Sequence, residues 1–391
     1  MDISIILITI LLLIVCISFP NKNHAAVIGG LSFGLITIQS PFPMIKMIAA
    51  VLLFLSFLIK NKDEVLLYLI LILGLISILS TNMFQIFLSL EIINFVSMTL
   101  LPLNTPKIVA LESALKFFIA SVISAAMFIL ATSISYLHSG ALYHFIGSLD
   151  LQITCKILLF ASLAIKLGII PGHIWMPEAY AGASYKNLLI IGILPKILVI
   201  TIAYHFVTIW ELDKFLLASL ILTGWAGVQG IAQNKIKKFL AYTFIFNNIF
   251  LLLPILTNNI SNVFGTFLFY LVNILLTFSV LIQSPINNIS HFIVTDKNLA
   301  LILSLSLFSS VGVPPLSGFL VKALPFSELN NILMLILIII LCCFLFYYLR
   351  LIAVLLFYTP QKKFFLCSSN FNIFTAGILY LNMSIFFLIF S

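Results

Sequence analysis

The chain contains very few charged residues for its length. Of its 391 residues only 8% are charged, whereas 63% are hydrophobic, and a soluble domain carries about 25% charged residues. Arginine occurs once, at Arg350, where we expect an anchor at the membrane interface. Apolar runs recur along the whole chain, each close to the roughly 20 residues that cross a bilayer. The composition excludes a soluble globular protein.

The sequence also lacks the signals of strands and of cofactor sites. Its apolar runs are continuous and do not alternate with polar residues, which excludes a membrane β-barrel. Its cysteines show no C-x-x-C spacing, and no Gly-rich phosphate loop follows a strand. We therefore expect an all-α polytopic membrane protein. We expect this chain itself to hold no metal, nucleotide, flavin, haem or iron–sulfur cluster, and to bind no nucleic acid.

Polar residues divide the chain into about fourteen predicted transmembrane spans. They lie near 3–19, 25–40, 44–59, 65–80, 83–101, 109–137, 152–183, 187–209, 215–233, 238–256, 261–284, 299–324, 331–358 and 371–390. Most loop lysines follow odd-numbered spans, and only Lys46, Lys156 and Lys214 follow even-numbered ones. By the positive-inside rule the odd loops face the cytoplasm or the mitochondrial matrix. Both termini then lie on the intermembrane-space or periplasmic side.

Two predicted spans are interrupted, and each interruption has a lysine beside it. The seventh span breaks after Lys166 in a Gly-Ile-Ile-Pro-Gly segment, and the twelfth breaks at Gly312-Val-Pro-Pro, before Lys322. Proline removes a backbone donor, so each helix must break or kink. Broken backbone at membrane depth is tolerated only inside protein or beside a water-filled cavity. Helices 7 and 12 are therefore the predicted broken helices.

The spacing of the two breaks predicts an internal repeat. They are five spans apart, and an odd offset reverses the direction of the chain through the membrane, as in inverted repeats. We predict helices 1–3 in residues 1–60, a first five-helix repeat of spans 4–8 in 61–210, a second of spans 9–13 in 211–358, and helix 14 in 359–391. The alternative is that the breaks are unrelated packing kinks.

Four charged residues stand out among those within the apolar spans, namely Glu91, Lys166, Lys196 and Lys322. An ionised side chain near the bilayer centre costs roughly 3 kcal/mol on insertion scales. A chain that keeps such residues is expected to use them, most often to move charge. We interpret the four as a proton relay in which Glu91 and Lys166 form a pair, and separation of the pair lets the lysine release its proton. Structural pairing, and for Lys166 snorkelling to an interface, are the alternatives.

Five further titratable residues could extend this relay, namely Glu112, Lys116, His173, Glu178 and His205. Glu112 and Lys116 are spaced i,i+4 at the start of the sixth span, so an ion pair at the interface is an equal alternative. His173, Glu178 and His205 could form a proton wire, as such residues do in pumps. For each of these three, a capping or loop role is the alternative.

Several segments, taken in order over roughly residues 85–325, resemble one family. Phe87-Leu-Ser-Leu-Glu91-Ile resembles a glutamate-bearing helix, and Glu112-Ser-Ala-Leu-Lys116-Phe-Phe resembles the opening of the next helix. Three further segments match sequence patterns of the family. Lys166 is followed by a segment that matches P-x-H-x-W-x-P-[DE]-x-Y-x-G. Residues Gln233 to Tyr242 match Q-x-x-[LI]-[KR]-[KR]-x-[LM]-A-Y, and residues Gly312 to Lys322 match G-x-P-P-x-x-G-F-x-x-K. Together they are similar to the antiporter-like membrane subunits of respiratory complex I. Within that family the similarity is greatest to the branch called subunit 2 in mitochondria and subunit N in bacteria.

The resemblance implies a proton-translocating subunit of NADH:ubiquinone oxidoreductase that is not catalytic in isolation. Glu91 and Lys166 would be the coupled pair, Lys196 the central relay and Lys322 the terminal proton site. NADH, FMN, iron–sulfur clusters and ubiquinone would belong to other subunits. The expected partners are the lipid bilayer and other membrane-arm subunits, including neighbouring antiporter-like ones. The expected location is the mitochondrial inner membrane, with a bacterial inner membrane as the alternative.

The sequence departs from the family pattern at two places. After Ala-Tyr242 the family usually has Ser-Ser-Ile-x-His, whereas this chain has Thr243-Phe-Ile-Phe-Asn247, which removes the histidine. Pro195 beside Lys196 is also unusual and should loosen that helix. The chain is similar as well to the D subunit of multisubunit sodium/proton antiporters, which is the first alternative function. A structural or assembly subunit is the second.

Overall fold

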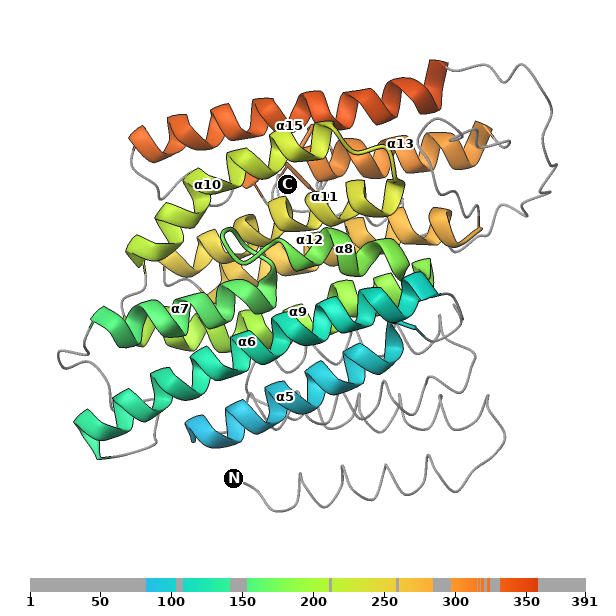
Figure 1. Cartoon of the computed structure of the whole chain (residues 1–391). Coiled ribbons are helices and arrows are strands. Elements are labelled where there is room, and N and C mark those ends of the chain that lie inside the picture. Colours follow the sequence, from blue (N-terminus) through green and yellow to red (C-terminus); the bar gives the residue numbers. More distant parts are fainter. Residues whose placement is uncertain are drawn as a thin grey trace, which may run out of the picture.

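The computed structural model describes residues 82–102, 108–140, 153–210, 213–257, 260–283, 297–314 and 331–357, together with 316, 318–319 and 322–323. Every regular segment among these residues is helical, and the helices run roughly alongside one another in a bundle (Figure 1). The first four predicted spans and the fourteenth lie outside the described residues.

The described helices correspond to the predicted spans five to thirteen. They are α5 (Met83–Leu100), α6 (Ile108–Ser139), α7 (Ile153–Leu167), α8 (Trp175–Gly182), α9 (Tyr185–Trp210), α10 (Asp213–Ile231), α11 (Ile236–Leu252) with the 3-10 turn η1 (Leu253–Thr257), α12 (Ile260–Gln283), α13 (Lys297–Val311) and α15 (Asn331–Phe357). The seventh span is the pair α7 and α8. Continuous apolar sequence forms helix here because a helix satisfies all its backbone hydrogen bonds internally.

Helices at the edge and at the centre of the bundle differ in how much apolar surface they expose. Among the described residues, Met83–Leu100, Ile108–His138, Ile236–Ile255 and Met334–Ala353 are long and apolar enough to cross a membrane. Only 28% of the apolar window of α6 is buried, whereas 89% of that of α11 is. Side chains such as Ile119 and Ile123 of α6 are exposed, as suits a helix that faces hydrocarbon. The helix α11 is the buried centre of the bundle.

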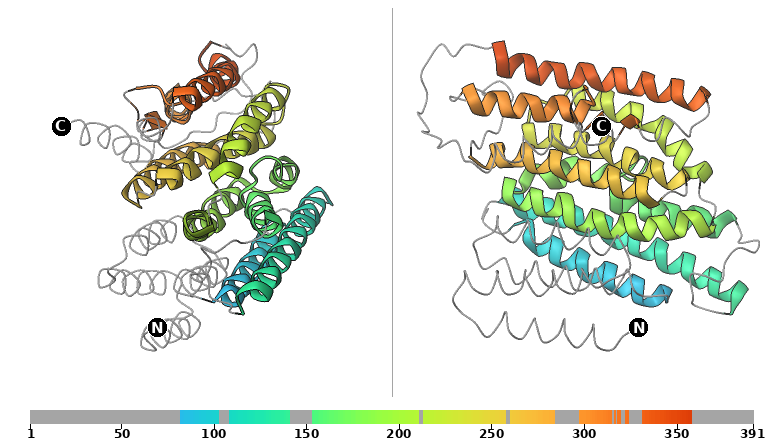
Figure 2. Two further views of the ribbon diagram at one scale, coloured as in Figure 1. Left: turned by 90° about the vertical axis from the view of Figure 1, so that its left-hand side faces the viewer. Right: turned by 180° about the vertical axis from the view of Figure 1, so that it is seen from behind.

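Contacts divide the described helices into two groups. Helices α5 to α8 pack mainly on one another, and α10, α11, α13 and α15 pack mainly on one another together with α12. Contacts of α8 with α11, and of α9 with both α11 and α12, join the groups. In Figures 1 and 2, α5 and α6 lie at one end of the bundle and α15 lies at the other. The inverted-repeat relation and the segment boundaries stay predictions, since span four lies outside the described residues.

Both predicted helix breaks are present, and the two helices end in the same way. The helix α7 ends before Gly168 (φ 67°), and α13 ends before Gly312 (φ 93°). A glycine favours this left-handed conformation because it has no Cβ. The next amide then reaches back across the last turn: Ile169 N donates to the Ala164 carbonyl over 2.8 Å, and Val313 N to the Phe308 carbonyl over 3.2 Å. By contrast, α9 runs through Pro195 without interruption.

Candidate functional site

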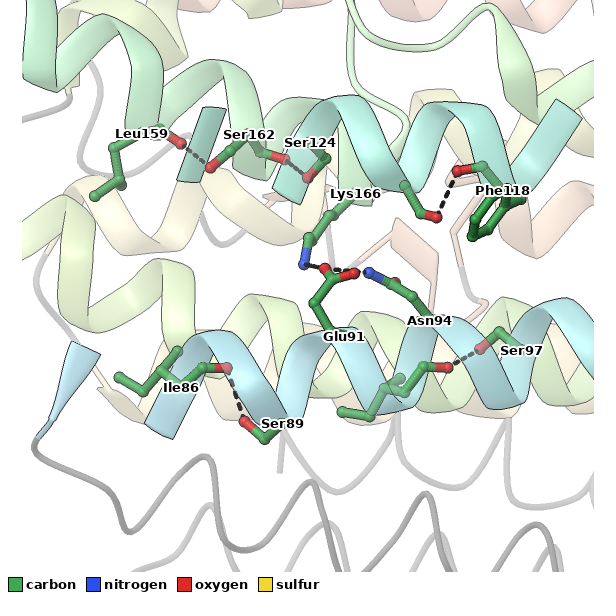
Figure 3. A network of polar contacts seen from close by, with 12 residues as sticks. Ile86, Ser89, Glu91, Asn94, Ser97, Phe118, Ser124, Leu159, Ser162 and Lys166 are labelled. Carbon is green, nitrogen blue, oxygen red and sulfur yellow. Dashed lines mark hydrogen bonds and ion pairs between the residues drawn. The ribbon is translucent and has the colours of Figure 1, made fainter. Parts of the chain in front are cut away.

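Glu91 and Lys166 form a buried ion pair, as predicted. Glu91 lies in the middle of α5 and Lys166 in the last turn of α7, and Figure 3 shows the two side chains pointing toward each other. Lys166 Nζ is 3.3 Å from Glu91 Oε1, with 4% of the lysine side chain and 17% of the glutamate side chain exposed. Asn94, one turn further along α5, donates to the same oxygen over 3.0 Å. The carboxylate is therefore held in place by two donors.

Neutral side chains donate hydrogen bonds to the last carbonyl groups of α7. Lys166 is therefore not needed as their donor and can face Glu91. The last carbonyls of a helix have no partner within the helix. Here Trp175 Nε1 donates to the Ile165 carbonyl over 2.8 Å, and Asn248 Nδ2 donates to the Leu167 carbonyl over 2.5 Å. Trp175 opens α8, and Asn248 comes from α11. The break in the helix thus positions Lys166 for its pairing.

A small cavity lies beside this pair and reaches Lys196. It has a volume of about 30 Å³, and its lining includes Lys166, Lys196, Asn94, Ser121 and Tyr180. A cavity of roughly 10–15 Å³ already holds one water if polar groups line it. The two lysines, which come from separate helices, therefore line one mainly apolar cavity that has a few polar groups and room for a water molecule.

Lys196 has a different environment from Lys166. It lies near the middle of α9, is 3% exposed and donates to the Tyr270 hydroxyl of α12 over 3.1 Å. Its Nζ lies 4.2 Å from the centre of the Phe244 ring of α11, within the range of a cation–π contact. Within the described ranges no ion pair involves Lys196. In this part of the chain, a charge on Lys196 is stabilised by a phenol and by the face of an aromatic ring.

Lys322 lies at the end of the second broken helix. It is 4% exposed and donates to the Ser310 and Val311 carbonyls of α13 over 2.6 and 2.7 Å. The C-terminal end of a helix carries partial negative charge, which stabilises a cation. Nζ also lies 4.5 Å from the centre of the Phe246 ring of α11. The lysine takes the role at α13 that Trp175 and Asn248 take at α7.

Three of the other predicted residues form an exposed network. Lys116 Nζ lies 2.7 Å from Glu112 and 3.2 Å from Glu178, and Lys238 Nζ lies 2.5 Å from the other oxygen of Glu178. The predicted i,i+4 pair is therefore present. About 40% of the Glu178 and Lys116 side chains is exposed. The network is therefore much more exposed than Glu91, Lys166, Lys196 and Lys322. It ties α6 and α8 to α11.

The remaining predictions have simpler outcomes. His173 is buried in the break between α7 and α8, and its Nε2 lies 3.4 Å from Gln229 Oε1. His205 is in α9, but its side chain lies outside the described part of the chain. Arg350 is exposed and donates to the Ile231 carbonyl and, over 3.2 Å, to Asn234 Oδ1. It joins α15 to the α10–α11 loop, which agrees with an anchoring role.

Several members of these contacts were not among the predicted site residues, and Lys238 and Tyr270 are the two that contact predicted residues through a charge or a hydroxyl. Lys238 was noted only as part of a loop motif, and its pairing with Glu178 crosses 60 residues of sequence. Tyr270 was hidden in an apolar span, where its single hydroxyl among phenylalanines and leucines was the one available signal. In the residues that the structure describes, no group of three His, Cys, Asp or Glu side chains could hold a metal ion.

The ion pair, the helix breaks and their lysines lie in a part of the chain that matches a known family. Residues 80–346, more than half of the chain, match the family described as "NADH:quinone oxidoreductase/Mrp antiporter, TM". The chain belongs to this family. The glutamate, lysine and proline–glycine segments that carried the resemblance all lie within the matched residues.

Relatives in this family include bacterial and mitochondrial proteins. NADH-quinone oxidoreductase subunit N of Pelagibacter ubique is 28% identical over 286 residues, which cover 66% of this chain and 60% of that protein. NADH-ubiquinone oxidoreductase chain 2 of Rhizopus oryzae is 28% identical over 289 residues, covering 65% and 55%. The chain thus spans less than two thirds of the length of these relatives. Their names agree with the predicted branch of the family.

A solved structure shares the fold. One chain in the structure of respiratory complex I from Thermus thermophilus with bound aureothin superimposes with a TM-score of 0.84 at 20% identity, covering 98% of this chain and 96% of that chain. The predicted all-helical, antiporter-like membrane fold is confirmed.

Proposed function

We propose that the chain is a proton-translocating membrane subunit of NADH:quinone oxidoreductase, with Glu91, Lys166, Lys196 and Lys322 as its proton carriers. One observation carries the proposal: two buried lysines line the same water-sized cavity, and among the described residues only Lys166 is paired with a carboxylate. Buried ionisable residues at membrane depth are kept for moving charge. The names of the curated relatives support this assignment.

The arrangement suggests how protons would move. While Glu91 lies 3.3 Å from Lys166, the carboxylate stabilises the ammonium form. Separation of the pair removes this attraction, and one proton then passes from Lys166 Nζ to water in the cavity and on to the neutral amine of Lys196. Among the described residues a phenol and no carboxylate lies beside Lys196, so its charged form is less stabilised than that of Lys166. It is a carrier, and the pair at Lys166 is the control point.

Lys322 is suited to be the terminal carrier. Two of its N–H groups are held by the Ser310 and Val311 carbonyls, and these two bonds are available to both the ammonium and the neutral amine. The third position on nitrogen is then an N–H in one state and a lone pair in the other. The nitrogen stays in place while one proton enters or leaves.

The rest of the assignment follows from the relatives. NADH, FMN, iron–sulfur clusters and ubiquinone would be bound by other subunits, and neighbouring membrane-arm subunits would flank this chain. The membrane would be the mitochondrial inner membrane or a bacterial inner membrane, with both termini on the side away from the lysine-rich loops. A sodium/proton antiporter subunit is the second candidate because the family description covers both kinds of protein.

Replacement of the lysines tests the proposal. In the assembled complex, reconstituted in vesicles, Lys166→Met and Lys196→Met should each slow proton transfer through this subunit by roughly 100-fold, the low end of what a positioned proton-transfer group contributes. Protons moved per electron should then fall by the share that this subunit contributes. Lys156→Met, in the first turn of the same helix α7, is the matched control and should pump normally. If both buried substitutions leave pumping and quinone reduction unchanged, the proposal is wrong. Sodium-dependent proton movement without NADH would favour the antiporter instead.

A further inference from the structure

An apolar groove lies between α10 and α15, two helices that pack side by side (Figures 1 and 2). The groove has a volume of about 440 Å³, within the range of about 300–1,000 Å³ that is typical of ligand pockets. Trp225 of α10 is 62% exposed beside it, and Ile339 of α15 is 55% exposed. Its lining includes Ile221, Trp225, Val228, Ile336, Ile339 and Cys343.

Two glycines of α10 shape this groove in different ways. A Cβ at Gly227 would lie 2.9 Å from the Phe344 ring, so α10 and α15 are in close contact at this point. About one turn earlier, a Cβ at Gly224 would meet only Cγ1 of Ile340, at 3.6 Å, which is an ordinary contact. Gly224 lines the groove. Its missing side chain therefore leaves space that a larger residue would fill.

The groove extends along α15 toward Arg350, over the depth of one membrane leaflet. Ile336, Cys343 and Arg350 are spaced by seven residues, or nearly two turns, and so share one face of α15. At 1.5 Å per residue, Ile340 lies about 15 Å from Arg350 along the helix axis. This length is half of the roughly 30 Å hydrocarbon core of a bilayer. The groove therefore matches the length of an acyl chain in one leaflet.

The end of the groove at Arg350 is basic. Arg350 is exposed, and its bonds to the Ile231 carbonyl and to Asn234 Oδ1 leave part of its five-donor guanidinium available. The neighbouring Lys235 is also exposed, and neither residue takes part in any of the described ion pairs. A guanidinium binds phosphate oxygens with two parallel hydrogen bonds. Basic pockets between membrane helices on the lysine-rich side are suited to phospholipid headgroups.

We propose that this groove is a binding site for an anionic phospholipid of the leaflet on the lysine-rich side. One acyl chain lies along α10 and α15, and the phosphate binds Arg350 and Lys235. An apolar groove of one leaflet's depth with a basic end fits a molecule that is apolar along its length and anionic at one end. A helix from a neighbouring subunit would be apolar across both leaflets and would bring no charge to Arg350. The site is separate from the proposed proton carriers.

A photoreactive lipid tests the site in the assembled complex. The complex is reconstituted in phosphatidylcholine vesicles that contain a small fraction of a lipid with a diazirine in one acyl chain. The headgroup of this lipid is either phosphatidylglycerol, which is anionic, or phosphatidylcholine, which is zwitterionic. After illumination, mass spectrometry measures the label on peptides of α10 and α15. The phosphatidylglycerol form should label both helices in preference to the phosphatidylcholine form.

Removal of the basic residues should reduce this preference. Lys235→Gln and Arg350→Gln should each lower it by roughly five-fold, the effect of one basic residue near a membrane surface. Lys186→Gln is the matched control, an exposed lysine on the same predicted side of the membrane but in the first turn of α9, and it should leave the preference unchanged. Gly224→Leu should fill the groove and lower labelling by both lipids.

Two results would overturn the lipid site. Equal labelling by the two headgroups would mean that only unselective boundary lipid contacts the groove. Absence of label on both helices in the complex would mean that protein covers the groove. If Arg350→Gln loosens α15 from the end of α10, Lys235→Gln decides by the same measurement, since Lys235 is exposed and precedes the first turn of α11. None of these results depends on whether the buried lysines carry protons.

Discussion

The three buried lysines have different surroundings, although each is a primary amine on the same four-carbon chain. Lys166 faces a carboxylate, Lys196 faces a phenol and a ring, and Lys322 faces two helix carbonyls. A carboxylate stabilises a charge most strongly and a lone phenol least. Along the proposed path, the protonated lysine is therefore stable at Lys166, transient at Lys196 and stable again at Lys322. Such an order allows a proton to pause at both ends and pass quickly through the middle.

At the scale of single residues, the Glu91–Lys166 pair should behave as one unit. A double-mutant cycle with Glu91→Gln and Lys166→Met should give a coupling of about 0.5–3 kcal/mol, the range for residues in one buried network. The measurement is the free energy of unfolding of the detergent-solubilised chain. The exposed pair Glu112–Lys116 is the control and should show a much smaller coupling, because solvent screens it. Equal coupling for the two pairs would contradict the burial of the first.

At the scale of elements, the two broken helices share one ending and differ in what closes it. Both end at a left-handed glycine with the same backbone hydrogen bond. Trp175 and Asn248 satisfy carbonyls at the end of α7, whereas Lys322 does so at the end of α13. The first break therefore leaves its lysine available for an ion pair on another helix. The second break uses its lysine as a cap.

Substitution of Gly312 should affect pumping as well as stability. A Cβ there would lie 2.9 Å from Cδ of Lys322, while a Cβ at Gly140, also left-handed, would meet nothing within 4 Å. Gly312→Ala and Gly140→Ala should each lose about 1–2 kcal/mol of stability from backbone strain. Only Gly312→Ala should displace the lysine and lower proton translocation, measured in vesicles against electron transfer. Equal pumping by the two variants would show that the position of Lys322 is not critical.

At the scale of the whole molecule, the side of the membrane that each loop faces is testable. Asn234 follows the ninth predicted span and Gly140 the sixth, and both are exposed. Asn234→Cys should react with a membrane-impermeant maleimide only from the lysine-rich side, and Gly140→Cys only from the other side. Labelling in right-side-out and inverted vesicles measures this, with the unchanged chain as background. Reaction of both positions from one side would mean that the predicted number of spans between them is wrong.

Much of the fold was predictable because, in a bilayer, the local sequence of a segment determines its secondary structure. In hydrocarbon every backbone polar group needs an internal partner, so an apolar run of sufficient length must be a helix. The predicted spans five to thirteen and the breaks beside Lys166 and Lys322 follow from this rule. Pro195 was less predictable: α9 continues through it, and a bundle that packs a helix on several sides can hold it together despite a lost hydrogen bond.

The sequence by itself determined the class of protein, the places of the spans and breaks, and which titratable residues lie at membrane depth, because hydropathy is a local property. Only the tertiary structure decided which of them meet. Lys166 reaches Glu91 across 75 residues of sequence and Lys196 reaches Tyr270 across 74. Such contacts depend on how each helix is rotated about its axis and which neighbour it packs against. Near-uniform apolar sequence does not encode that rotation, since every face of the helix is compatible with lipid or with protein.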